Sequence, residues 1–215
     1  HNSYANLDNI LAAEKLSAVQ GMLLDLGLSS LQLGSKNRGF SYRSEGPLDM
    51  RFDQSNGSNA KKLIDLADRD SLVQIFKEYG EERLASRIAK SIKEMSAMNT
   101  IADLREAIRR CTPPNHRDRT FARIFQALRI AVNGELDILQ QFLTKFIDFL
   151  HPGGRIVIIS YHSLEDRLVK HSFKELASGG TLDILTKRPI TATEKEQKNN
   201  RRAGSAKLRA ALKVA

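Results

Sequence analysis

An aspartate ends the first strongly apolar segment of this chain, and small residues follow it. Met22-Leu23-Leu24 has the pattern of a buried strand, and Asp25 stands directly after it. Gly27, Ser29 and Ser30 come next. Open α/β sheets bind ligands at the carboxyl ends of their strands, so Asp25 is a candidate ligand-binding residue. Its small neighbours would let a flat ring approach closely. The alternative is an aspartate that only caps a turn.

A second polar group follows another apolar segment. Residues 155–160 (RIVIIS) form a near-continuous apolar run, which is typical of a strand buried on both faces. Tyr161 and His162 come directly after it, again at the carboxyl end of a predicted strand. His162 could contact a phosphate or assist the loss of a proton, and the alternative is a capping or packing histidine. Ser163 is expected to cap the helix that follows.

The chain is basic, with a net charge of +9 and a pI near 9.8. Such a balance is expected for a protein with a polyanionic partner, although many basic proteins bind no nucleic acid. Arginines concentrate in loops beside the polar groups: Arg38, Arg43, Arg51, Arg117, Arg119 and Arg123. This distribution favours a functional basic surface. Asp49 and Arg51 could instead form an ion pair that holds their loop, and one of Arg123 and Arg129 could pair internally.

The elements that must position these groups alternate between strand and helix. The periodicity predicts, in chain order, a helix over 7–16, the strand at 22–24, short helices between 56 and 111, a long helix over 121–150, the strand over 155–160, a helix over 164–176 and a hairpin of 182–185 with 206–212. Ser71 with Gln74 has the spacing of a capping box, and Thr100 can cap a further helix. The alternation argues for an α/β sheet with parallel strands and a small helical insertion.

Several classes of protein are disfavoured by the sequence. No apolar run approaches the length of a membrane span. Cys111 is the only cysteine, which rules out an internal disulfide and fits a reducing cytoplasm. The five histidines lack the spacing of metal ligands, so no metal is expected. The chain has neither the nucleophile elbow of a hydrolase nor a G-x-G-x-x-G loop.

Four ordered blocks of the chain together resemble one family. The blocks are GMLLDLGLSSLQ continuing to RGFSYRSEGPLDMRFD over 21–53, FQALRIAVNGEL over 125–136, HPGGRIVIISYHSLEDRLVK over 151–170 and RRAGSAKLRAA over 201–211. They resemble the RsmH (MraW) type of S-adenosylmethionine-dependent ribosomal RNA methyltransferase, whose signature is roughly DLGxSSxQ, RGFSF and GPLDMRM. One departure precedes the second block, where the family usually has H-P-x-T-R and only Arg123 is retained here.

The resemblance implies a Rossmann-like methyltransferase sheet, formed by 1–55 and 117–215, with 56–116 inserted as a helical substrate-recognition domain. It implies methyl transfer from S-adenosylmethionine to the N4 amine of a cytidine in small-subunit (16S) ribosomal RNA. The expected catalytic residues are Asp25, Ser29, Ser30 and His162. The expected cofactor contacts are Tyr4, Asp25 and Gln32. The expected RNA contacts are Arg38, Phe40, Arg51, Arg123 and Arg129. A base-stacking aromatic is also needed, with Phe40, Tyr42 and Tyr161 as candidates.

The family carries a glycine-rich cofactor loop upstream of the segment that His1-Asn2-Ser3-Tyr4 resembles. The chain is therefore expected to lack the family's N-terminal part, which puts its own activity in question. The alternative function is a catalytically silent RNA-binding or ribosome-assembly module, and cofactor titration of this chain against an extended one would discriminate. A nicotinamide enzyme is disfavoured by the missing glycine fingerprint. The expected partner is the small subunit or its RNA, in the cytoplasm, with a homodimer left open.

Overall fold

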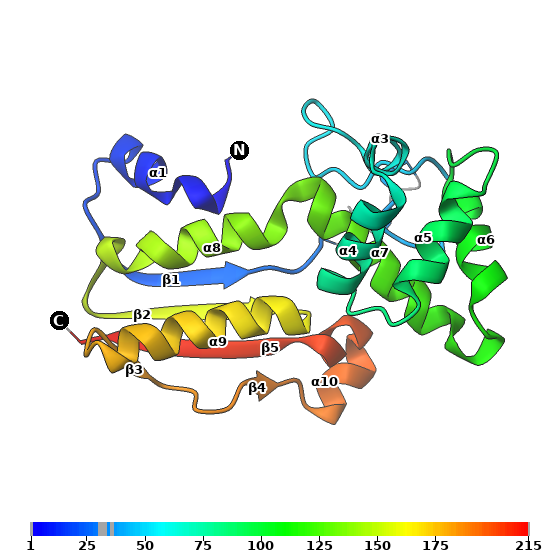
Figure 1. Cartoon of the computed structure of the whole chain (residues 1–215). Coiled ribbons are helices and arrows are strands. Elements are labelled where there is room, and N and C mark those ends of the chain that lie inside the picture. Colours follow the sequence, from blue (N-terminus) through cyan, green and yellow to red (C-terminus); the bar gives the residue numbers. More distant parts are fainter. Residues whose placement is uncertain (1, 30–33, 35–36, 215) are drawn as a thin grey trace. The chain divides into compact units, whose positions relative to one another are not determined.

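The chain divides into two compact units in the computed structural model, which describes residues 2–29, 34 and 37–214. The first unit joins the segment up to residue 27 with the segment from 136 onward, and the second covers 28–135 (Figure 1). The second unit is larger than the helical insertion predicted over 56–116. The difference arises because Phe40, Leu48 and Met50 before that segment, and helix α7 after it, are buried in one core with the insertion.

The first unit contains the sheet. Its elements are η1 (Tyr4–Asn6), α1 (Leu7–Ala13), β1 (Val19–Asp25), α8 (Glu135–Lys145, whose first residue is the last of the second unit), η3 (Phe146–Phe149), β2 (Leu150–Ser160), α9 (Ser163–Ser178), β3 (Leu182–Ile184), β4 (Ile190–Thr191), α10 (Glu194–Asn199), η4 (Arg201–Ser205) and β5 (Lys207–Lys213). The strand order is β1-β2-β5-β3, and β4 pairs with β5. β1 and β2 are parallel, with Asp25 opposite Ile159, whereas β5 runs antiparallel to β2 and to β3. The predicted parallel pair and the closing antiparallel hairpin are both confirmed.

One face of this sheet is packed more tightly than the other. Ile156 and Ile158 of β2 are buried among apolar side chains of α8, η3 and α9. Their neighbours Val157 and Ile159 point to the opposite face and are only half-buried, and Leu23 of β1 is 71% exposed. The prediction that residues 155–160 are buried on both faces is therefore wrong for the described part of the chain. The described helices cover one face, and an apolar run alone does not reveal how many faces are covered.

The second unit is helical. Its elements are α3 (Ala60–Leu66), α4 (Arg69–Glu78), α5 (Ala85–Lys93), α6 (Ile101–Cys111), η2 (Pro114–His116) and α7 (Arg117–Asn133). Thr100 caps α6, as predicted, and forms a capping box with Asp103. The predicted box of Ser71 with Gln74 is wrong, because α4 begins earlier and Asp68 accepts from the Ser71 N–H. Among the described residues no helix is long and apolar enough to span a membrane.

The predicted long helix over 121–150 is in fact two helices. Gly134 ends α7 in the left-handed conformation, with φ of 61°, and α8 starts at the next residue. Glycine adopts this conformation without a steric penalty, so it can end a helix whose apolar pattern continues on both sides. The break falls at the boundary between the two units, which is a position that periodicity alone does not mark. The polar segment predicted as a joining loop over 191–202 contains α10 and part of η4.

Candidate active site

Asp25 lies at the carboxyl end of β1, and its side chain is exposed. Pairing with β2 continues one residue further, because the Leu26 N–H donates to the Ile159 carbonyl at 3.0 Å. The chain then turns, and the Gly27 N–H donates to Oδ1 of Asp25 at 2.9 Å. Asp25 therefore does cap its turn, as the simpler interpretation predicted. The turn uses one carboxylate oxygen in this way, and the exposed group retains capacity to accept further hydrogen bonds.

Tyr161 comes from the end of the neighbouring strand and contacts Asp25. Its ring and the Asp25 carboxylate both lie against Gly27. Burial raises the pKa of Tyr161, and the negative charge of Asp25 raises it further, so the hydroxyl stays protonated and remains a donor. A methyl group on Gly27 would lie 2.6 Å from Cε2 of Tyr161. The two strand ends thus bring together Asp25, Gly27 and Tyr161.

Replacing Gly27 by alanine should therefore disturb this group of residues. The added carbon would push against the Tyr161 ring and against Oδ1 of Asp25, which would be 3.0 Å away. We expect the rate of the reaction that this site performs to fall by about tenfold to a hundredfold, because small misplacements of reacting groups have large effects on rate. The matched control is Gly21→Ala on the same strand, where the added carbon would meet only the Arg155 oxygen at 3.8 Å. Equal rates for the two variants in a single-turnover assay would contradict a close approach at Gly27.

His162 is the N-cap of α9, which corrects the prediction that Ser163 caps this helix. The Glu165 N–H donates to Nδ1 of His162 at 3.3 Å, and Oε2 of Glu165 accepts from the Tyr161 N–H at 2.8 Å. Nε2 of His162 lies 3.2 Å from Oε1 of Glu165, but without the geometry of a hydrogen bond. The capping interpretation is thus confirmed. A catalytic role for His162 stays a proposal.

Asp166, one turn into α9, links the helix to the sheet. It accepts from Nε of Arg209 at 2.7 Å and lies 3.4 Å from Nζ of Lys207, both on β5. Burial acts to raise the pKa of Asp166, but the hydrogen bond and charge of Arg209, together with Lys207, outweigh it and hold the pKa below its ordinary value. Asp166 therefore forms a buried structural contact on the face of α9 that meets β5.

The other residues predicted for the cofactor and the substrate amine are placed as follows. Tyr4 is half-buried in η1, and its ring packs edge-on against Phe142 of α8, with centroids 5.6 Å apart. Ser29 is exposed near the start of the second unit. Ser30 and Gln32 lie outside the described residues. The structure thus gives Tyr4 a packing role, and its contact with a cofactor remains a prediction.

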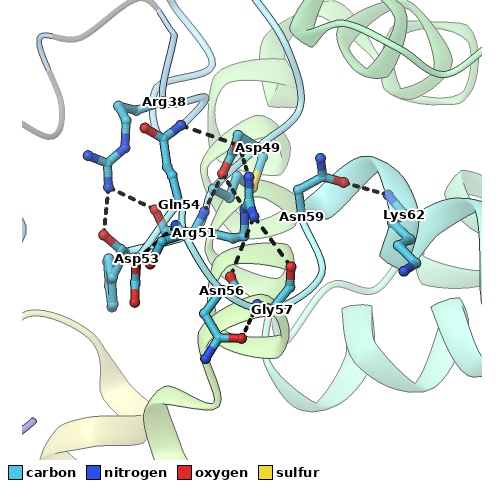
Figure 2. A network of polar contacts seen from close by, with 12 residues as sticks. Arg38, Asp49, Arg51, Asp53, Gln54, Asn56, Gly57, Asn59 and Lys62 are labelled. Carbon is cyan, nitrogen blue, oxygen red and sulfur yellow. Dashed lines mark hydrogen bonds and ion pairs between the residues drawn. The ribbon is translucent and has the colours of Figure 1, made fainter.

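The Arg38–Arg51 loop of the second unit is held by a polar network (Figure 2). Arg51 donates to Asp49 through Nε at 3.0 Å and Nη2 at 2.8 Å, as the predicted structural ion pair requires. Burial acts to raise the pKa of Asp49, but the hydrogen bonds from Arg51 and Gln54 outweigh it and lower that pKa. Arg38 donates through Nη2 to the carbonyls of Arg51 and Phe52, each at 2.8 Å.

The arginines predicted to contact RNA differ in their partners. Arg129 donates through Nε and Nη2 to the two carboxylate oxygens of Glu135, each at 2.8 Å, and Nη1 of Arg123 lies 3.6 Å from Oε2 of Glu82. Both arginines therefore pair internally, whereas only one of the two was predicted to do so. Arg38 has no ion pair with a carboxylate in the part of the chain that the structure describes. Phe40 is 7% exposed, so its ring offers little surface to a base. The RNA contacts of these residues stay proposals.

Asn133 is a positioning residue that the sequence analysis missed. Its Nδ2 donates to the Met50 carbonyl at 2.7 Å, and its Oδ1 accepts from the Phe52 N–H at 2.7 Å. It thereby ties the end of α7 to a loop 81 residues away in sequence, around Met50, which is fully buried and has a φ of +62°. The only sequence signal was its place within the block FQALRIAVNGEL, because a single asparagine near a helix end does not reveal a distant partner.

The fold and the site define a class of protein. A parallel strand pair with Asp25 and Tyr161 at its carboxyl ends, followed by a helix and a closing antiparallel hairpin, is a Rossmann-like methyltransferase sheet. Comparison with known proteins agrees. The sequence profile of the MraW methylase family matches residues 1–214, and the chain belongs to this family.

Three curated relatives carry the name Ribosomal RNA small subunit methyltransferase H. The protein of Kosmotoga olearia is 48% identical over 217 residues, which cover 99% of this chain and 72% of that protein. The protein of Halothermothrix orenii is 44% identical over 235 residues, which cover 100% of this chain and 76% of that protein. The protein of Synechocystis is 48% identical over 203 residues, which cover 93% of this chain and 66% of that protein.

Proposed function

We propose that this protein transfers a methyl group from S-adenosylmethionine to the N4 amine of a cytidine in small-subunit (16S) ribosomal RNA. The observation that carries the proposal is the exposed carboxylate of Asp25 at the end of β1, held by the Gly27 N–H and with the Tyr161 ring close by. Membership of a methylase family, whose relatives are named as methyltransferases of small-subunit ribosomal RNA, supports the choice of reaction and substrate.

The chemistry explains why a carboxylate is needed. The lone pair of the cytosine amine is delocalised into the ring, so the amine is a poor nucleophile. Asp25 would accept a hydrogen bond from this amine and hold its nitrogen in line with the methyl group, while Tyr161 fixes the orientation of the carboxylate. Methyl transfer would form the nitrogen–carbon bond and break the methyl–sulfur bond, whose electron pair stays on the sulfur of the demethylated cofactor. The methylated amine is more acidic and would lose a proton, for which Asp25 is the proposed acceptor.

Asp25 and Tyr4 are the described residues that we propose to contact S-adenosylmethionine. Gly27 has no side chain, so the Tyr161 ring lies directly against it beside Asp25, and an added carbon there would clash with the ring. When bound, S-adenosylmethionine supplies a methyl group on a positively charged sulfur. Asp25 would interact favourably with that positive charge, and Tyr4 would present its aromatic ring to the cofactor. His162 and Glu165 form the capping box of α9, and Glu165, which accepts from the Tyr161 N–H, would hold the backbone of Tyr161 in place.

The second unit is proposed to bind the RNA. Its described arginines include Arg83, Arg87, Arg109 and Arg110, which are exposed, and segment 56–116 is proposed as its substrate-recognition part. When arginine side chains bind RNA phosphates, counterions are released from the RNA. The affinity for RNA should therefore fall as the salt concentration rises. The proposed partner is the small subunit or its RNA, and the proposed compartment is the cytoplasm, where this substrate lies.

The test is the transfer of a labelled methyl group to ribosomal RNA by the native, full-length protein. Small subunits that lack the modification should become labelled, and large-subunit RNA and transfer RNA should not. A protein that binds small-subunit RNA with salt-dependent affinity but transfers no methyl group to it would support the silent RNA-binding module instead, and would overturn the proposal.

A further inference from the structure

Phe52 is an aromatic residue of the second unit that is exposed to solvent, with a relative exposure of 39% for the whole residue. It stacks on Phe40, with ring centroids 5.5 Å apart and planes inclined by 27°. Phe40 itself is 7% exposed and belongs to the core of the unit. The buried ring therefore supports the outer one from one side. Part of Phe52 stays in contact with solvent and is therefore available to a second flat group.

The backbone around this ring is fixed on both sides. The Phe52 N–H donates to Oδ1 of Asn133 at 2.7 Å, and the Phe52 carbonyl accepts from Nη2 of Arg38 at 2.8 Å. Gly39 adopts a φ of +72°, and a side chain there would lie 2.8 Å from the Pro47 carbonyl, so the loop strands are tightly apposed. A ring held in this way loses little conformational freedom when a second flat group stacks on it.

The electrostatic surroundings suit an anionic partner. The Arg38 guanidinium lies 5.5 Å from the centroid of the Phe40 ring, next to the stacked pair, and has no ion pair with a carboxylate among the described residues. Asp53, the neighbouring acid, is turned toward Ser55 and accepts from its N–H at 2.9 Å. Proteins that bind single-stranded nucleic acid combine exposed aromatic side chains, on which bases stack, with positively charged groups along the phosphates.

We propose that Phe52 is a stacking platform for an unpaired nucleobase of the RNA substrate, with Arg38 beside it to interact with the adjoining phosphate. This inference rests on the proposed function for the identity of the RNA. It also moves the stacking role from Phe40, which is buried, to the outer ring of the same pair. Of the other candidates, Tyr42 is half-buried and packs against Phe121 and Phe125.

The chain contains no tryptophan, so Phe52→Trp would introduce a single fluorescent reporter at the platform. A short single-stranded oligonucleotide of cytidines should quench its fluorescence, because a stacked base quenches an indole. The matched control is Leu66→Trp, at a side chain of the same unit that is 75% exposed. That tryptophan should not be quenched. In parallel, Phe52→Leu should bind the oligonucleotide about 5- to 100-fold more weakly than the unaltered protein.

Circular dichroism of each variant checks that the fold is retained. An oligonucleotide that binds without quenching Phe52→Trp, or quenches both tryptophans equally, would overturn the platform. Methyl transfer to small-subunit RNA is measured with the unaltered protein in the same series. Transfer without selective quenching would reject the platform alone, whereas selective quenching without transfer would reject the proposed reaction and keep the platform.

Discussion

Asp25→Asn should lower the rate of methyl transfer about a hundredfold to a thousandfold in a single-turnover assay. The substitution keeps the shape of the side chain but replaces a charged acceptor with an amide, half of which is a donor. Losing one preorganised polar contact to a reacting group typically has an effect of this size. The substitution would also remove the negative charge that now raises the pKa of the neighbouring Tyr161 hydroxyl.

Two further measurements separate this role from a structural one. The affinity for RNA should barely change, since an acidic side chain neutralises no phosphate. The free energy of unfolding should fall by no more than the loss of a turn cap explains. Asp183→Asn, at an exposed carboxylate on β3 of the same unit, is the control and should keep its rate. An Asp25 variant with normal turnover would remove the central residue of the proposed mechanism.

Asp166→Ala should destabilise the first unit by about 3–5 kcal/mol, the range expected when one partner of a buried ion pair is removed. Arg209 has a side chain that is 9% exposed, and Asp166 is the acid to which it donates. Lys207 is more exposed, at 37%, and can reach solvent. The uncompensated charge of Arg209 therefore accounts for most of the expected effect. Chemical denaturation would measure it, and Asp183→Ala, which removes an exposed acid, should change the stability little.

The same contact predicts how stability depends on pH. The pKa of Asp166 is held below its ordinary value of 3.8, so the folded state binds this proton less readily than the unfolded chain. Its contribution is fully present above about pH 4 and is lost as the pH falls through the lowered folded-state pKa. Unfolding measured as the pH falls below about 4 should therefore show a steeper loss in the unaltered protein than in Asp166→Asn. Parallel curves would argue that the ion pair contributes nothing.

The strands and the strand ends can be predicted from the sequence because their signals are local. Met22-Leu23-Leu24 and residues 155–160 are apolar runs that end at polar groups, and both form strands of the parallel pair. Thr100 was identified as a cap from the short-range pattern that capping requires. Asp25 and Tyr161 lie together because parallel neighbouring strands end at one edge of the sheet, which is a property of the fold class.

The features that the sequence analysis missed depend on contacts between distant residues. Gly134 splits an apolar pattern that continues on both sides, so its left-handed turn was not predicted. The partners of Arg129 and Arg209 lie in other elements or after the turn, and an arginine alone does not reveal whether it faces a carboxylate or solvent. The exposure of Phe52 over the buried Phe40 likewise depends on a loop that Asn133 holds from the end of α7.

The most direct test of the central claim is the chemical identity of the methylated nucleoside. Small-subunit RNA would be treated with the native protein and S-adenosylmethionine carrying a heavy-isotope methyl group, digested to nucleosides and analysed by mass spectrometry. The account predicts that the heavy methyl group is found in N4-methylcytidine, and that the amount formed in one turnover falls sharply with Asp25→Asn. A heavy methyl group on a ring carbon, on the ribose hydroxyl or on another base would contradict the account.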